Sequence, residues 1–222
     1  MARFTRIQVA QKMKEQGMVP LFYHADLEVC KKMVTACYKG GARLLEFTNR
    51  GDYAHEVFGE LNKYCAEACP EMILGVGSVT DAGTTALYLQ LGANFVVTPV
   101  FRQDIAITCN RRKVLWSPGC ASLTEIATAE EWGAEIVKLF PGSVYGPKFI
   151  KSVIAPQPWT SIMPTGGVAP TQENLKSWFD AGAYCVGMGS KLMLKKDDGS
   201  FDYAGIQALT TEALKMIDQI RS

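Results

Sequence analysis

A lysine stands in the middle of an apolar run, where its side chain could act as a nucleophile. Lys138 is the only charged residue of the segment 136–140, and Pro141-Gly142 ends the run. Such a run is typical of a buried strand. Burial disfavours the charged ammonium, and a neutral amine is a nucleophile. In the alternative interpretation, the stem is buried while the ammonium reaches water at the strand end, so this segment alone leaves both open.

A glutamate occupies a second apolar run and could move protons. Glu46 lies between Leu44-Leu45 and Phe47 on a predicted strand. A carboxyl group in apolar surroundings has a raised pKa, which suits it to exchange protons near neutral pH. The alternative is a structural ion pair of Glu46 with Arg50 or Lys138. Arg50 lies beyond the run, where its planar guanidinium could hold a substrate carboxylate through two bonds or simply be solvated.

A fold must position these residues, and the sequence indicates which one, because a strand followed by a helix is predicted eight times along the chain. The expected strands are 18–23, 43–48, 72–79, 94–100, 114–116, 135–140, 160–164 and 184–188. The expected helices are 4–16, 26–40, 53–69, 80–92, one ending at 112, 122–133, 147–154, 171–182 and 202–220. Four of them end in Gly-Ala directly before a strand, and glycine supplies the left-handed residue that ends a helix.

The eightfold alternation predicts an α/β fold, a (β/α)8 TIM barrel with an N-terminal helix. The length of 222 residues fits one such barrel. No shift in composition marks a linker, so a single domain is expected over residues 1–222. An open, doubly wound sheet is the alternative fold.

In a (β/α)8 barrel the active site lies at the C-terminal ends of the strands. The glycine-containing ends fall on the seventh and eighth strands, the usual place in these barrels for a phosphate site built from backbone N–H groups. Gly166-Gly167 and Gly189-Ser190 are the candidates, although glycines also serve simply to make tight turns. The candidate residues at all of these ends are Glu46, Arg50, Ser78, Pro99, Lys138, Thr165, Gly166, Gly167, Gly189 and Ser190.

Composition argues against several functional classes. The net charge of +1 gives no electrostatic reason to expect a nucleic-acid or membrane partner. No apolar run approaches the roughly 18 residues of a membrane-spanning helix, and residues 1–17 lack a signal-peptide core. The seven scattered cysteines are expected to be reduced, partly buried thiols of a cytoplasmic protein. Cys65 and Cys69 share a helix face, but the only histidines are His24 and His55, so neither a zinc site there nor a histidine-rich centre is expected. No metal is predicted, although a carboxylate-based site stays open.

Four motifs occur in an order and spacing that resemble one family: Leu45–Arg50, Gly75–Val79, Val137–Pro141 and Pro164–Val168. Over nearly its whole length the chain resembles the class I aldolases that act on 2-keto-3-deoxy-6-phosphogluconate (KDPG) or 4-hydroxy-2-oxoglutarate (KHG). The resemblance implies a homotrimer, a small 2-keto acid substrate, and chemistry that needs no metal or organic cofactor.

The resemblance also implies roles for individual residues. Lys138 would form the Schiff base and Glu46 would be the general acid and base. The substrate contacts would be Arg50, Ser78, Pro99 and Thr165, and the phosphate contacts would be Gly166, Gly167, Gly189 and Ser190. The implied reaction splits a 2-keto-4-hydroxy acid, foremost KDPG, into pyruvate and an aldehyde, glyceraldehyde 3-phosphate.

The chain departs from the family pattern at three places. Ser78 replaces a threonine and keeps the hydroxyl, whereas Val100 replaces a glycine and adds bulk on the aldehyde side. His24 follows the first strand, where many members carry a basic residue, and it is either a polar contact or a surface histidine. KHG or a related 2-keto-3-deoxy sugar acid is an alternative substrate. More remote alternatives are a sugar-phosphate barrel enzyme without a covalent lysine and a barrel that only binds a ligand.

Overall fold

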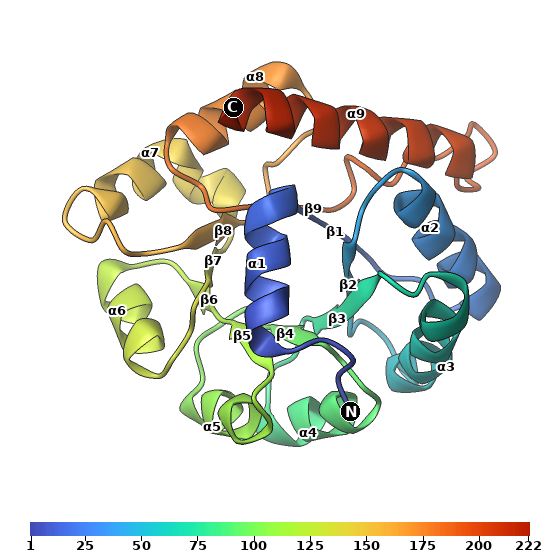
Figure 1. Ribbon diagram of the computed structural model, residues 1–222, viewed down its shortest axis with the longest axis horizontal. Helices are drawn as coiled ribbons and strands as arrows, with labels where there is room; N and C mark the ends of the chain where they lie inside the picture. Colours follow the sequence, from blue (N-terminus) through green and yellow to red (C-terminus); the bar gives the residue numbers. More distant parts are fainter.

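A computed structural model describes residues 1–222, and its strands form a closed ring surrounded by helices (Figure 1). Six strands pair in parallel in the order β5-β4-β3-β2-β1-β9, and three more in the order β6-β7-β8. The strands are β1 Met18–Phe22, β2 Leu44–Thr48, β3 Ile73–Gly77, β4 Phe95–Val97, β5 Leu115–Ser117, β6 Gly119–Cys120, β7 Val137–Leu139, β8 Ile162–Pro164 and β9 Val186–Met188.

Two junctions join these sheets into one barrel. Pro118 interrupts the fifth barrel strand between β5 and β6, but its carbonyl still accepts a hydrogen bond of 2.8 Å from the Lys138 N–H. On the other side, a parallel bridge links Thr165 to Gly187, and the Tyr184 N–H donates to the Ile162 carbonyl at 2.9 Å. Nine strand segments therefore make eight barrel strands, which confirms the predicted barrel and makes the open sheet wrong.

Four helices begin at a residue whose side chain caps the first turn. The Asp26, Asp81, Ser122 and Thr171 side chains each accept a hydrogen bond from a backbone N–H of the helix that follows. The helices are α1 Arg6–Gln16, α2 Leu27–Lys39, α3 Ala54–Ala68, α4 Ala82–Gln90, α5 Gln103–Arg112, α6 Leu123–Glu131, α7 Gly142–Ile154, α8 Gln172–Asp180 and α9 Tyr203–Arg221.

The predicted helix from Pro147 to Ile154 is present, but a short helical turn that the sequence did not show precedes it, so that α7 spans Gly142–Ile154. Gly146 interrupts it with a left-handed φ of 67°, so α7 consists of a short first turn and a longer helix that restarts at Pro147. Proline suits the first turn of a helix, so Pro147 indicates the helix start and the sequence does not predict the short turn before it.

Apolar side chains fill the barrel interior toward the N-terminal ends of the strands. The interior cluster comprises Val9, Met13, Val19, Leu44, Ile73, Phe95, Val97, Leu115, Ile136, Met163 and Cys185. Two of these residues, Val9 and Met13, come from α1, which lies across one end of the strand ring (Figure 1). Helix α1 thus covers the N-terminal end of the barrel.

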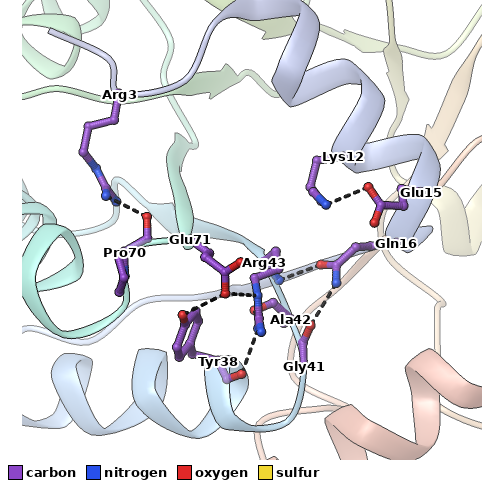
Figure 2. Close-up of polar contacts among 10 residues, drawn as sticks. All are labelled: Arg3, Lys12, Glu15, Gln16, Tyr38, Gly41, Ala42, Arg43, Pro70 and Glu71. Carbon is purple, nitrogen blue, oxygen red and sulfur yellow. Dashed lines mark hydrogen bonds and ion pairs between the residues drawn. The ribbon is translucent and has the colours of Figure 1, made fainter.

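Polar contacts fix α1 to the segments that lead into β2 and β3 (Figure 2). The Gln16 side-chain amide donates to the Gly41 carbonyl at 2.8 Å and accepts from the Arg43 N–H at 2.6 Å. Arg43 in turn forms an ion pair with Glu71 at 3.2 Å. These contacts tie the end of α1 to the start of β2, the strand that carries Glu46.

All seven cysteines are buried and none forms a disulfide. The structure contains no group of three or more histidine, cysteine, aspartate or glutamate side chains placed to hold a metal ion, at Cys65 and Cys69 or elsewhere. No helix is both long enough and apolar enough to cross a membrane.

Replacing Gln16 with alanine should destabilise the fold. The substitution removes two hydrogen bonds and leaves a partly buried N–H and carbonyl without these partners, so the free energy of unfolding should fall by about 1–3 kcal/mol. Urea denaturation followed by circular dichroism measures the change. Gln11→Ala is the matched control, because Gln11 is exposed on the same helix. Equal stability of the two variants would contradict the proposed anchoring of α1.

Candidate active site

Lys138 points into the barrel from β7. It shares its strand face with Ile136, which belongs to the interior cluster, and its side chain is only 6% exposed. The Nζ atom lies 4.8 Å from the centroid of the Phe140 ring. Burial lowers the pKa of the Lys138 amine below its ordinary value, and the negative charge of Glu46 partly opposes this shift. The interpretation of a buried amine is therefore confirmed over that of a lysine whose ammonium reaches water.

Glu46 points into the barrel from β2, on the far side of the strand ring from Lys138. It is 1% exposed, and its Oε2 atom has no hydrogen-bond partner in the protein. Burial raises the pKa of this carboxyl, while the positive charges of Lys138 and Arg50 oppose the shift. Glu46 takes part in none of the ion pairs of the structure, so the alternative of a structural ion pair with Arg50 or Lys138 is not supported.

Glycines on neighbouring strands leave space for the side chains of Glu46 and Thr165. Gly77 pairs in register with Thr48 on the same strand as Glu46, and a Cβ atom at Gly77 would overlap the Glu46 carboxylate. A Cβ atom at Gly187 would likewise overlap the Thr165 hydroxyl. The glycines of the third and eighth barrel strands are therefore part of the wall that admits polar side chains to the interior.

Two further hydroxyl groups lie inside the barrel without a partner. Thr165, directly after β8, is 6% exposed, and its Oγ1 atom forms no hydrogen bond within the protein. Ser117 is fully buried on β5, on the face of Leu115, and its Oγ atom is equally unpaired. Buried polar atoms normally have partners, so these atoms, with Glu46 Oε2, mark an interior prepared for a polar ligand. Ser117 was not among the predicted site residues, although it directly follows the predicted strand 114–116.

Arg50 and Ser78 stand together at the mouth of the barrel. Arg50 is exposed, and its Nε atom donates to the Ser78 hydroxyl at 3.4 Å. Ser78 has a φ of 58°, a left-handed conformation that is uncommon for residues other than glycine and that recurs at functional sites. Pro99, at the end of the fourth barrel strand, is partly exposed near the same rim.

The two glycine loops lie at the mouth but do not line a common cavity. Gly166 and Gly167 have φ values of 91° and 76° and pack against Ser143 in the first turn of α7. Gly189 and Ser190, after β9, instead line a cavity of about 660 Å³ that also reaches Arg50. We call this space the mouth cavity. The buried groups Lys138, Glu46 and Thr165 are not part of its lining.

The mouth cavity has basic residues that the sequence did not single out. Lys191 and Lys195 line it beside Ser190. Because both lie beyond the last barrel strand in a charged loop, their types and spacing gave no signal of a common site.

His24 has a structural role at the start of α2. Its Nδ1 atom accepts a hydrogen bond of 3.0 Å from the N–H of Asp26, the residue that caps this helix. Its ring packs edge-on against Phe201 with 6.0 Å between centroids. These contacts support the interpretation of a surface histidine held by its neighbours.

Comparison with known proteins identifies the family. The family described as KDPG and KHG aldolase matches residues 9–209. The chain is 32% identical over 191 residues to the 2-dehydro-3-deoxy-phosphogluconate aldolase of Pseudomonas aeruginosa, covering 85% of this chain and 84% of that protein. It is 36% identical over 121 residues to the 2-dehydro-3-deoxy-6-phosphogalactonate aldolase of Escherichia coli, covering 54% of this chain and 58% of that protein.

Solved structures share the fold. The KDPG aldolase of Legionella pneumophila, described with pyruvate captured as a covalent carbinolamine intermediate, superposes with a TM-score of 0.81 at 22% identity. The match covers 92% of this chain and 97% of that one. The barrel, the opposed buried lysine and glutamate, and the family match over most of the chain lead to one conclusion: this protein belongs to the KDPG and KHG aldolase family of carbon–carbon lyases.

Proposed function

We propose that residues 1–222 form one aldolase domain that cleaves KDPG to pyruvate and glyceraldehyde 3-phosphate through a Schiff base on Lys138. The observation that carries this proposal is the pair of buried ionisable groups on opposite walls of the barrel. Burial lowers the pKa of the Lys138 amine and raises the pKa of the Glu46 carboxyl, so each group is shifted toward its neutral form. A neutral amine can attack a ketone, and a carboxyl group with a raised pKa can exchange protons near neutral pH.

The reaction begins with attack of the Lys138 amine on the C2 ketone. This step forms a carbinolamine with a new C–N bond. Glu46, directly or through a water molecule, protonates the carbinolamine hydroxyl, which leaves as water. The product is an iminium ion whose positive charge can accept the electron pair of the C3–C4 bond.

In the cleavage step Glu46 accepts a proton, whereas in the previous step it donated one. The Glu46 carboxylate removes the proton of the C4 hydroxyl, the C3–C4 bond breaks, and the aldehyde leaves. The electron pair moves into the iminium to give an enamine. Protonation at C3 and addition of water release pyruvate and restore the Lys138 amine, so the water lost in the first half is consumed in the second.

The mouth residues bind and orient the substrate in this proposal. Arg50 and Thr165 contact the pyruvate-derived end, with Ser78 and Pro99 beside it. The fork of the Arg50 guanidinium suits a carboxylate, and the unpaired Thr165 hydroxyl can bond to the substrate. The backbone N–H groups of the loops at Gly166-Gly167 and Gly189-Ser190 contact the phosphate.

The identity of the substrate can be tested directly. KHG is the alternative keto acid, and 2-keto-3-deoxy-6-phosphogalactonate, the substrate in the name of the E. coli relative, differs from KDPG in its configuration at C4. Cleavage rates for KDPG, its C4 epimer and KHG, measured through coupled oxidation of pyruvate, rank the three. The proposal expects KDPG to have the highest kcat/KM, and a higher value for either rival would reassign the substrate.

The assembly and location of the protein are further parts of the proposal. A homotrimer is proposed from the family resemblance, and light scattering of the purified protein tests it by the mass of the particle. A cytoplasmic location is proposed because all seven cysteines are unpaired thiols, as is usual in a reducing compartment.

Lys138 should form a covalent adduct with pyruvate. Incubation with pyruvate followed by borohydride should reduce the Schiff base to a stable secondary amine, which peptide mass spectrometry locates on Lys138. Lys138→Ala should give no adduct and no cleavage. Lys148→Ala, which removes an exposed lysine from α7, is the control and should react like the unsubstituted protein. An adduct absent from the folded protein would instead favour a sugar-phosphate enzyme without a covalent lysine.

Glu46→Gln should slow turnover by roughly 10²- to 10⁴-fold, because it removes the proton-transferring group. The variant should also change the pH dependence of adduct formation. The Glu46 carboxylate raises the pKa of Lys138, so its loss should move the inflection of the trapping rate to lower pH. Stopped reduction at a series of pH values measures this shift. Unchanged turnover, or an inflection that moves to higher pH, would remove Glu46 from the mechanism.

Gly77→Ala should inactivate the enzyme, because the new methyl group would occupy the position of the Glu46 carboxylate. Gly59→Ala, a buried helical glycine whose Cβ atom would meet only Leu91 at an ordinary 3.4 Å, is the control and should keep normal activity. Circular dichroism confirms that both variants fold. Normal cleavage by Gly77→Ala would show that Glu46 does not need its present position.

A further inference from the structure

The mouth cavity has an unbalanced charge. Its charged residues are Arg50, from the loop after β2, and Lys191 and Lys195, from the segment after β9, and no aspartate or glutamate lines it. In a chain whose basic and acidic residues nearly balance, 23 against 22, three cations without an anion around one cavity form a local exception. A concave space lined by one sign of charge attracts ligands of the opposite sign.

The backbone around Lys191 is held in place by a turn. The Leu192 N–H donates to the Gly189 carbonyl at 2.9 Å, and the Leu192 side chain is fully buried. Lys191 therefore follows Ser190 on a segment anchored to the core. Its ammonium lies on a flexible stem, but its point of attachment beside the mouth cavity is fixed.

The position of Lys195 is set by a hairpin. Lys195 and Phe201 form an antiparallel bridge, and the Lys195 Nζ atom lies 5.4 Å from the centroid of the Phe201 ring. The Lys196 N–H donates to the Ser200 carbonyl at 2.8 Å inside the same hairpin. Phe201 is itself a wall of the mouth cavity, so the cation–π contact holds the ammonium at that wall.

Two of the three acidic residues of this segment have other partners, and the third, Asp197, does not line the mouth cavity. Asp198 accepts hydrogen bonds from the N–H and the hydroxyl of Ser200. Asp202 caps α9 by accepting a bond of 3.0 Å from the Gly205 N–H. Neither Lys191 nor Lys195 forms an ion pair with a carboxylate of the protein.

We infer that Lys191 and Lys195 bind the distal phosphate of the substrate and make the enzyme selective for phosphorylated 2-keto sugar acids. This inference rests on the proposed aldolase function and adds two side chains to a phosphate site otherwise assigned to backbone N–H groups. The substrate carries an anion at each end, and Arg50 and the two lysines supply cations from different segments of one cavity. A phosphate near neutral pH carries close to two negative charges, which two ammonium groups match.

The same arrangement disfavours the shorter substrate. KHG carries a single negative charge at its distal end, directly on the aldehyde fragment, so it offers half the charge and less reach toward the lysines. The lysines should thus act on the choice between substrates, while the Schiff-base chemistry at Lys138 proceeds without them.

The test compares kcat/KM for KDPG and for unphosphorylated 2-keto-3-deoxygluconate in the variant K191A/K195A. For KDPG, kcat/KM should fall about tenfold or more, chiefly through KM, because two charge-assisted contacts are lost. For the unphosphorylated acid it should change little. The variant K191Q/K195Q, which keeps most of each side-chain stem, should behave in the same way. Lys196→Ala is the matched control, because Lys196 lies in the same hairpin but does not line the cavity.

A second readout uses inorganic phosphate as the probe. Phosphate should inhibit cleavage of the unphosphorylated acid competitively in the unsubstituted enzyme, with an inhibition that weakens as salt rises. In K191A/K195A this inhibition should be lost or greatly reduced. Equal losses for both acids, an unchanged preference for KDPG, or an equal effect of Lys196→Ala would overturn the inference.

Failure of the inference is distinguishable from failure of the aldolase function. Trapping of pyruvate on Lys138 does not depend on the distal phosphate, so it should be equal in the unsubstituted enzyme and in K191A/K195A. If neither protein forms the adduct, the aldolase function itself is wrong. If both form it and the preference for KDPG survives in the variant, the lysines do not bind the phosphate.

Discussion

The rest of the structure depends on one constraint: an amine and a carboxyl group are buried on opposite walls of a barrel without forming an ion pair. Desolvation is the largest influence on both groups, and it drives each toward its neutral form. A direct ion pair would have stabilised the charged forms of both groups and opposed these shifts. The separation of the two strands around the ring keeps Lys138 and Glu46 close enough to feel each other's charge but unpaired.

The two ends of the barrel differ in what fills them: apolar side chains at one end and polar side chains at the other. Below the site, the interior is filled with apolar side chains, and α1 covers it with Val9 and Met13. Above that layer, glycines at 77 and 187 replace side chains on the wall and admit Glu46 and Thr165. Buried polar atoms without partners cost stability, so the apolar half and the polar anchors of α1 must supply the stability that the site gives up.

The sequence was sufficient to predict the fold and the two charged residues buried inside the barrel. Eight repeats of strand and helix, ended by glycines and begun by capping residues, predict the barrel because each signal is local. Lys138 and Glu46 were recognisable because a charge within an apolar run contradicts its surroundings. The fifth barrel strand continues past Pro118 to Cys120, and a helical turn precedes Pro147, because local signals do not show how far tertiary contacts extend an element.

Other features could not be found from the sequence because they depend on contacts between distant segments. Gly77 leaves the space that the Glu46 carboxylate occupies, but the sequence around Gly77 does not indicate that Glu46 lies next to it. Lys191 and Lys195 belong to the site through a turn and a hairpin after the last strand, where a run of polar residues resembles an ordinary loop. The glycine loops were predicted as one phosphate site, but only Gly189 and Ser190 line the mouth cavity. The phosphate role of Gly166 and Gly167 stays a prediction.

The most direct test of the account is the pKa of the Lys138 amine itself. Titration of protein labelled with ¹³C at the lysine Cε, followed by NMR and assigned with Lys138→Met, measures it separately from the exposed lysines. The account predicts an inflection for Lys138 clearly below the ordinary lysine value of 10.5. A Lys138 inflection at or above 10.5 would contradict it, because the amine would then be a buried ammonium and not the nucleophile around which the barrel is built.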